Sequence, residues 1–131
     1  MVLSVNERTF NQEVLESSIP VLIHFWAPWC GLCRLVQPLL SEFDKHGSKY
    51  IKIVDVNADE NFKLSNAYRL TTLPTLILIE NRTVQLRHDS FKGRDELRLM
   101  LEKINISYTN QTLTGSNTLA SPSHLSNLHY R

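Results

Sequence analysis

The sequence is poor in several features that would point to particular classes of protein. It has two cysteines among 131 residues, whereas a structural zinc site needs four ligands. Its net charge of +1, from 14 basic and 13 acidic residues, gives no electrostatic reason to bind nucleic acid or an anionic membrane. No apolar run approaches the roughly 20 residues that span a bilayer, and the opening residues lack the pattern of a signal peptide. We therefore expect a cytoplasmic protein.

The composition predicts one small domain followed by a polar segment. Hydrophobic residues make up 42% of the chain and charged residues 21%, as in an ordinary globular protein. From residue 107 onward, Ser, Thr and Asn fill about half of the positions and no apolar period is sustained. Such a segment cannot bury enough surface to offset its ordering entropy. We expect a domain over residues 1–106 and a disordered tail over residues 107–131.

The two cysteines stand close together as a C-x-x-C pair, Cys30 and Cys33. They follow the apolar run from Val21 to Trp26 and precede a helical pattern, which indicates a dithiol at a strand-to-helix turn. The start of a helix offers free N–H groups and a partial positive charge, which favour a thiolate. A purely structural disulfide would close a loop of only about four residues and constrain the unfolded chain little. The five histidines are scattered without ligand spacing, so a redox-active dithiol is favoured over a zinc site.

Periodicity predicts strands and helices in the order β-α-β-α-β-α-β-β-α. The run from Val21 to Trp26 has no polar face apart from His24, which is typical of a central strand covered by helices on both sides. A helix should run from Gly31 to near Gly47, with a kink at Pro38. The other expected strands are 2–5, 50–56, 75–79 and 83–87, and the other expected helices begin near residue 6, cover 60–68, and include 97–104.

The hairpin between the last two strands should turn at Asn81 and Arg82. A tight type I′ turn needs positive φ at both central residues, and Arg82 argues against that geometry.

Two motifs carry a family resemblance. The stretch Phe25-Trp26-Ala27-Pro28-Trp29-Cys30-Gly31-Leu32-Cys33 resembles the thioredoxin active site, F-W-A-x-W-C-G-P-C, and Thr72-Leu73-Pro74-Thr75-Leu76 resembles the cis-proline loop of that family. The likeness runs from about Val2 to Ile106. It implies an α/β thioredoxin fold, with a central mixed β-sheet flanked by helices on both faces, and a monomeric protein-disulfide reductase.

The resemblance implies roles for the residues that match it. Cys30 is the expected nucleophile, which also fits its place at the helix start, and Cys33 is the resolving thiol. The residues expected to contact the substrate are Trp29, Gly31, Leu32, Leu73 and Pro74. A cis bond before Pro74 would aim the Leu73 backbone at the dithiol, where it could pair with an extended substrate. Trp26 is expected to pack beneath the site. The family has a glycine in a third substrate loop, and either Ser90 or Gly93 takes that place here.

Two positions depart from the family pattern. Leu32 replaces a proline that restrains the backbone, and our hypothesis is that the disulfide is therefore more oxidising than that of a typical thioredoxin. His24 replaces a buried aspartate, and Asp55 falls at the position of that aspartate's lysine partner. We hypothesise that His24 accepts the proton of Cys33 and that Asp55 stabilises the imidazolium. The alternative is a neutral core histidine bonded to backbone or water, with Asp55 exposed at a strand end.

The function that these residues favour is reduction of disulfides in protein substrates. No bound cofactor or metal is expected beyond the Cys30–Cys33 disulfide, and the resemblance implies a thioredoxin reductase, fed by NADPH or ferredoxin, as the reducing partner. Three alternatives stay open. They are a more oxidising exchange or isomerase protein, a redox-independent binding module that presents Trp29 and Leu73, and a metal or cluster scaffold shared between two subunits.

Overall fold

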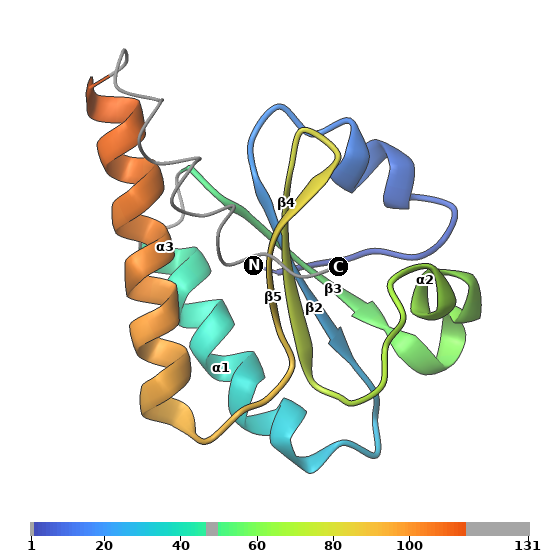
Figure 1. Ribbon diagram of the computed structural model, residues 1–131. Coiled ribbons are helices and arrows are strands. Elements are labelled where there is room, and N and C mark those ends of the chain that lie inside the picture. Colours follow the sequence, from blue (N-terminus) through green and yellow to red (C-terminus); the bar gives the residue numbers. More distant parts are fainter. Residues whose placement is uncertain (1, 47–49, 115–131) are drawn as a thin grey trace.

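A computed structural model describes residues 2–46 and 50–114. Its centre is a single sheet of five strands in the order β1-β3-β2-β4-β5 (Figure 1). Strands β1, β3 and β2 run parallel, and β4 is antiparallel to both β2 and β5. The expected mixed sheet is confirmed, with the apolar strand β2 in the middle. The strands are β1 (Leu3–Ser4), β2 (Val21–Trp26), β3 (Lys52–Asn57), β4 (Thr75–Glu80) and β5 (Thr83–His88).

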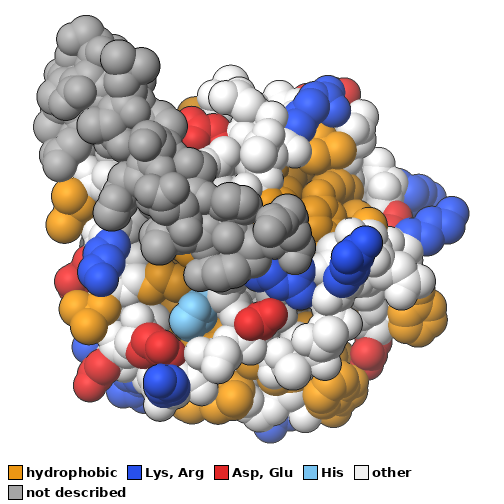
Figure 2. Space-filling model, viewed as in Figure 1, with side chains coloured by type: hydrophobic (Ala, Val, Ile, Leu, Met, Phe, Trp, Pro, Cys, Tyr) orange, Lys and Arg blue, Asp and Glu red, His pale blue; other side chains and the backbone are white. Residues whose placement is uncertain are grey.

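Helices cover both faces of this sheet (Figure 1). Helices α1 (Gly31–His46) and α3 (Arg94–Thr114) lie side by side on one face. On the other face lie the short π-helix η1 (Asn11–Leu15) and α2 (Phe62–Ala67), which follows the 3₁₀ turn η2 (Ala58–Glu60). Basic and acidic side chains are interspersed over the face seen in Figure 2 rather than gathered by sign.

Strand β2 is apolar because it supplies both layers of the core. Successive side chains of a strand point to opposite faces. Leu22 packs in the cluster under α1 and α3, whereas Ile23 and Phe25 pack in the cluster under η1 and α2. Each of these three side chains is fully buried. A strand in this position has no solvent face, so its one polar member, His24, is buried as well.

The first helical segment begins at the expected cap. Asn6 accepts hydrogen bonds from the backbone N–H groups of Arg8 and Thr9, at 2.8 and 3.1 Å, and the segment leads into η1. The helix expected over 60–68 is divided by Asn61, whose φ of −138° lies outside the helical range. Its side-chain N–H₂ donates to the Asn57 carbonyl and its side-chain oxygen accepts from the Glu7 N–H, so tertiary contacts hold it in this conformation.

The β4–β5 hairpin has the geometry that Arg82 was expected to prevent, so that prediction was wrong. Asn81 and Arg82 have φ values of 53° and 68°, and Glu80 pairs directly with Thr83 across the two-residue loop. A non-glycine residue in this region costs roughly 1–2 kcal/mol. The paired strands on either side offset that cost.

Helix α3 runs from Arg94 to Thr114 and so passes the predicted domain boundary at residue 106. Tyr108 is buried at one turn beyond Ile104, and its hydroxyl donates to Glu80 Oε1 at 3.0 Å. The helix therefore has one more anchored turn than the serine-rich composition suggested. Residues 115–131 of the predicted tail lie outside the described part of the chain. In the described residues, no helix is both long and apolar enough to cross a membrane.

Candidate active site

The two cysteines meet where the central strand joins the first long helix. Strand β2 ends at Trp26 and α1 begins at Gly31, so Cys30 directly precedes the helix and Cys33 lies in its first turn. They form a disulfide with a Cα–Cα distance of 5.4 Å. Cys30 retains 5% exposure and Cys33 2%. In this oxidised state both sulfurs are largely buried.

The helix start acts directly on Cys30. The backbone N–H of Cys33 donates to Cys30 Sγ at 3.2 Å, as a helix N-terminus does to the side chain that caps it. This bond and the partial positive charge of the helix start both stabilise negative charge on that sulfur. Reduction would therefore leave Cys30 with the more readily formed thiolate.

A proline turn lies at the same end of the sheet. The Leu73–Pro74 peptide bond is cis, and Thr75, the first residue of β4, pairs with Phe25 near the end of β2. The Thr75 hydroxyl donates to the Thr72 carbonyl at 2.8 Å, which closes the turn. Strand pairing thus brings the Leu73–Pro74 turn beside the strand end that leads into the dithiol.

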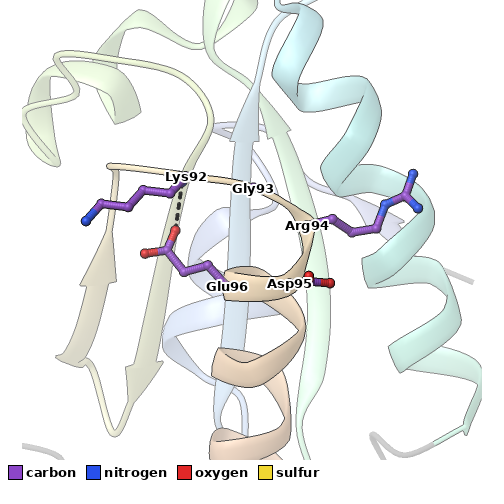
Figure 3. A pocket seen from close by; sticks show the side chains of 5 residues that line it. All are labelled: Lys92, Gly93, Arg94, Asp95 and Glu96. Carbon is purple, nitrogen blue, oxygen red and sulfur yellow. Dashed lines mark hydrogen bonds between the residues drawn. The ribbon is translucent and has the colours of Figure 1, made fainter.

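The segment after β5 joins this end of the molecule through Asp89. The Thr72 hydroxyl donates to the Asp89 carbonyl at 3.1 Å, so the residue before Ser90 lies against the proline turn. Gly93 instead precedes α3 with φ of 152°, a value that favours glycine. There the Lys92 N–H donates to Glu96 Oε1 at 2.8 Å (Figure 3).

The indole of Trp29 is exposed, yet it is held in place. Its exposure is 68%, and its Nε1–H donates to Asp59 Oδ2 at 2.8 Å. Asp59 lies in η2, where its own N–H donates to the side chain of Asn57. Sequence reasoning missed Asp59, because a carboxylate 30 residues away carries no local pattern that links it to the dithiol. Trp26, by contrast, is partly buried at the end of β2, and Pro38 lies inside α1.

Behind the dithiol, His24 and Asp55 are aligned neighbours on β2 and β3. Their exposures are 1% and 8%, so Asp55 does not stand exposed at a strand end. Burial lowers the pKa of His24 from 6.5 to about 4. Burial also raises the pKa of Asp55, and the Ser4 and Trp26 side chains oppose that shift. Two buried nitrogens at this place, His24 Nε2 and Trp26 Nε1, have no partner within hydrogen-bonding distance and angle among the described residues.

His24 shares a face with the buried side of α1. His24 lies two residues after Leu22, so both side chains point to the same face of the sheet. Leu22 is in one hydrophobic cluster with Val36 and Leu40 of that helix. Cys33 lies three residues before Val36 and is also buried. The imidazole therefore points to the layer in which the resolving position lies.

A reactive disulfide that caps a helix, with a proline turn beside it, defines a class of protein. Thiolate attack on a disulfide needs an acidified sulfur, a second sulfur within bonding distance and a place for an extended substrate. The protein is a thiol–disulfide oxidoreductase. In the described part of the chain, no group of three or more His, Cys, Asp or Glu side chains is placed to hold a metal ion.

Comparison with known proteins gives the family. The thioredoxin family model matches residues 1–105. Thioredoxin 1 of Nostoc sp. is 38% identical over 83% of this chain and 91% of its own length. Thioredoxin of Rickettsia prowazekii is 36% identical over 82% of this chain and 99% of its own. Thioredoxin 1 of Synechococcus elongatus is 49% identical over 60% of this chain and 73% of its own. The chain belongs to the thioredoxin family.

Acid should destabilise the protein through His24. The buried imidazole has a pKa of about 4, against 6.5 for an accessible histidine. Between these values the unfolded chain binds a proton that the folded chain does not. The contribution to stability is fully present above pH 6.5 and falls by up to about 3 kcal/mol as the pH approaches 4. The raised pKa of Asp55 acts in the opposite sense, because the folded carboxyl takes up its proton first and offsets part of the loss at the acid end.

The measurement is urea unfolding of the oxidised protein at a series of pH values from about 7 to about 4. His24→Leu should show a much smaller loss of free energy of unfolding on acidification. Ile23→Val, which changes a buried neighbour on β2 without removing a titrating group, is the matched control and should keep the wild-type dependence. An unchanged dependence in His24→Leu would mean that other groups cause it.

Proposed function

We propose that the protein reduces disulfides in substrate proteins, with Cys30 as the nucleophile and Cys33 as the resolving thiol. The Cys30 thiolate attacks one sulfur of a substrate disulfide, forms a mixed disulfide and releases the other sulfur as a thiolate. Cys33 then loses its proton and attacks Cys30 Sγ, which releases the second substrate thiol and closes the Cys30–Cys33 disulfide. The observation that carries the assignment is the hydrogen bond from the Cys33 N–H to Cys30 Sγ.

Each turnover oxidises the dithiol to the Cys30–Cys33 disulfide by two electrons, so a reductant must restore the dithiol. We assign this step to a thioredoxin reductase, the partner that family membership suggests. We further propose that the protein works as a monomer in the cytoplasm and needs no cofactor beyond its own disulfide.

The substrate is proposed to lie across the end of the sheet. Leu73, before the cis bond, offers backbone groups for pairing with an extended chain, as an added strand would use them. Trp29, Gly31, Leu32 and Pro74 would border that chain. The bond between Thr72 and the Asp89 carbonyl supports Ser90, rather than Gly93, as the third contact loop.

The order of the two thiols can be tested with single variants. In Cys33→Ser, Cys30 keeps the helix start and should react with iodoacetamide at neutral pH at least about tenfold faster than Cys33 does in Cys30→Ser. Cys33→Ser should also accumulate a mixed disulfide with insulin, whereas Cys30→Ser should not. The two variants serve as each other's control, and equal alkylation rates would overturn the assignment.

The proton of Cys33 needs an acceptor, and we propose that His24 takes it. With a pKa of about 4, the imidazole is neutral at physiological pH and has a free lone pair. A group with so low a pKa is a weak base, so it holds a proton only if a negative charge stabilises the imidazolium. We propose that Asp55 supplies that charge, and its alignment with His24 on the neighbouring strand supports this role.

His24→Ala should slow resolution of the mixed disulfide at least about tenfold and change its pH profile. Asp55→Asn, which keeps the imidazole but removes the charge, should slow the same step. Single-turnover kinetics across the pH range would separate this step from the initial attack, which neither variant should change. If His24→Ala resolves the mixed disulfide at the wild-type rate at every pH, another group accepts the proton.

Leu32 is proposed to make the disulfide more oxidising than that of a typical thioredoxin. Proline at this position would restrain the backbone and so favour the disulfide relative to the dithiol, an effect worth up to about 1 kcal/mol. Leu32→Pro should therefore lower the reduction potential by roughly 20 mV, whereas Leu32→Ala should leave it unchanged. Equilibration with a thiol redox buffer measures both. A wild-type value at or below about −270 mV would contradict the proposal, and one near about −180 mV would favour the exchange or isomerase alternative.

A further inference from the structure

One flank of α1 carries an apolar stripe that begins at the dithiol. Leu32 and Leu35 are each 48% exposed, and Leu39 and Phe43 follow as partly buried residues. Their spacing of three, four and four residues places them on one side of the helix. Surface leucines that stand singly need no explanation, but these four form a line that starts beside the reacting sulfurs.

The far end of the stripe enters a groove between α1 and α3 with a volume of about 340 Å³. The side-chain oxygen of Asn105 is buried there and receives no hydrogen bond from any described residue. Because this oxygen has almost no exposed surface, the groove offers a partner mainly the apolar side chains of Leu39, Phe43 and Leu101. Its lining residues are Leu39, Glu42, Phe43, Arg98, Leu101, Glu102 and Asn105.

The stripe and the groove form one surface with the active site. Helices α1 and α3 lie side by side (Figure 1), and Arg94 extends from the start of α3 towards α1 (Figure 3). At 1.5 Å per residue, the distance from Leu32 to Glu42 along the helix is about 15 Å. A bound disulfide must contact Cys30, so a chain that leaves it on this side runs along Leu32 and Leu35.

We propose that this flank of α1 and its groove are a docking track for an amphipathic helix of the substrate protein, adjacent to the disulfide that is reduced. A groove between two helices receives apolar side chains spaced by three or four residues, and about ten helical residues would cover the track. Two carboxylates, Glu42 and Glu102, and one guanidinium, Arg98, also line the groove, so charged groups border its apolar side chains. The substrate segment is therefore apolar with polar edges.

This inference rests on the proposed reduction of protein disulfides and adds the kind of substrate that is preferred. Leu35 is the residue on which to test it, because it is half exposed and lies outside the C-x-x-C motif. Leu99 of α3 is the matched control: it is also a helical leucine, 57% exposed, and does not line the groove.

The probes are two synthetic peptides of equal length, each joined through its cysteine to a coloured thiol. One carries leucines at positions i, i+3 and i+7 beside the cysteine, and the other carries serines there; each is made with the cysteine at either end. In at least one orientation, wild-type protein should reduce the leucine peptide with a kcat/KM about fivefold above that of the serine peptide, the gain expected from partial burial of one leucine. Leu35→Gln should lose this preference, and Leu99→Gln should keep it.

The outcomes distinguish the docking track from the proposed reduction of disulfides. Equal rates for both peptides in both orientations, or a preference that survives in Leu35→Gln, would overturn the docking track. Failure to release the coloured thiol from any peptide would instead contradict the proposed function. Reduction of the peptides with the expected preference would support both.

Discussion

The structure depends on the burial of strand β2, in which every residue before Trp26 is buried. It is bonded to β3 on one edge and β4 on the other, and both of its faces are covered by helices. A strand fixed on four sides ends at a defined place, and Trp26 is that end. The dithiol, the start of α1 and the Leu73–Pro74 turn are all positioned relative to it. Precise placement of a reactive sulfur thus follows from ordinary hydrophobic packing several residues away.

The same burial sets the chemistry of His24 and Asp55. A polar side chain in a strand without a solvent face loses its hydration, which disfavours the charged form of both groups. The histidine is held neutral, and the pKa of the carboxyl is raised. The two residues are aligned on neighbouring strands, and the proposed proton transfer would require the Asp55 carboxylate to stabilise the His24 imidazolium. A buried pair of this kind costs folding free energy, and a role in moving a proton would explain its presence.

Features set by local pattern could be predicted from the sequence, and those set by distant contacts could not. The apolar run of β2, the C-x-x-C pair and the proline turn are each recognisable from a short stretch of sequence, so the sheet and the dithiol were predictable. The bond between Trp29 and Asp59 joins segments 30 residues apart, and the extra turn of α3 depends on Glu80, 28 residues before Tyr108. The φ values at Asn81 and Arg82 were missed for a related reason, because the paired strands impose them.

The surroundings of Cys30 differ in how firmly they are held. On one side, Trp29 is bonded to Asp59, the Thr75 hydroxyl closes the turn by bonding to Thr72, and the Thr72 hydroxyl ties that turn to Asp89. On the other side, Leu32 and Leu35 are half exposed apolar side chains on a helix, whose position is fixed but whose contacts are incomplete. Since Cys30 itself has only 5% of its surface exposed, a substrate must make most of its contacts with these neighbours. In the proposed binding mode, the fixed side would hold the backbone of the substrate chain, and the leucines on the other side would select among substrates.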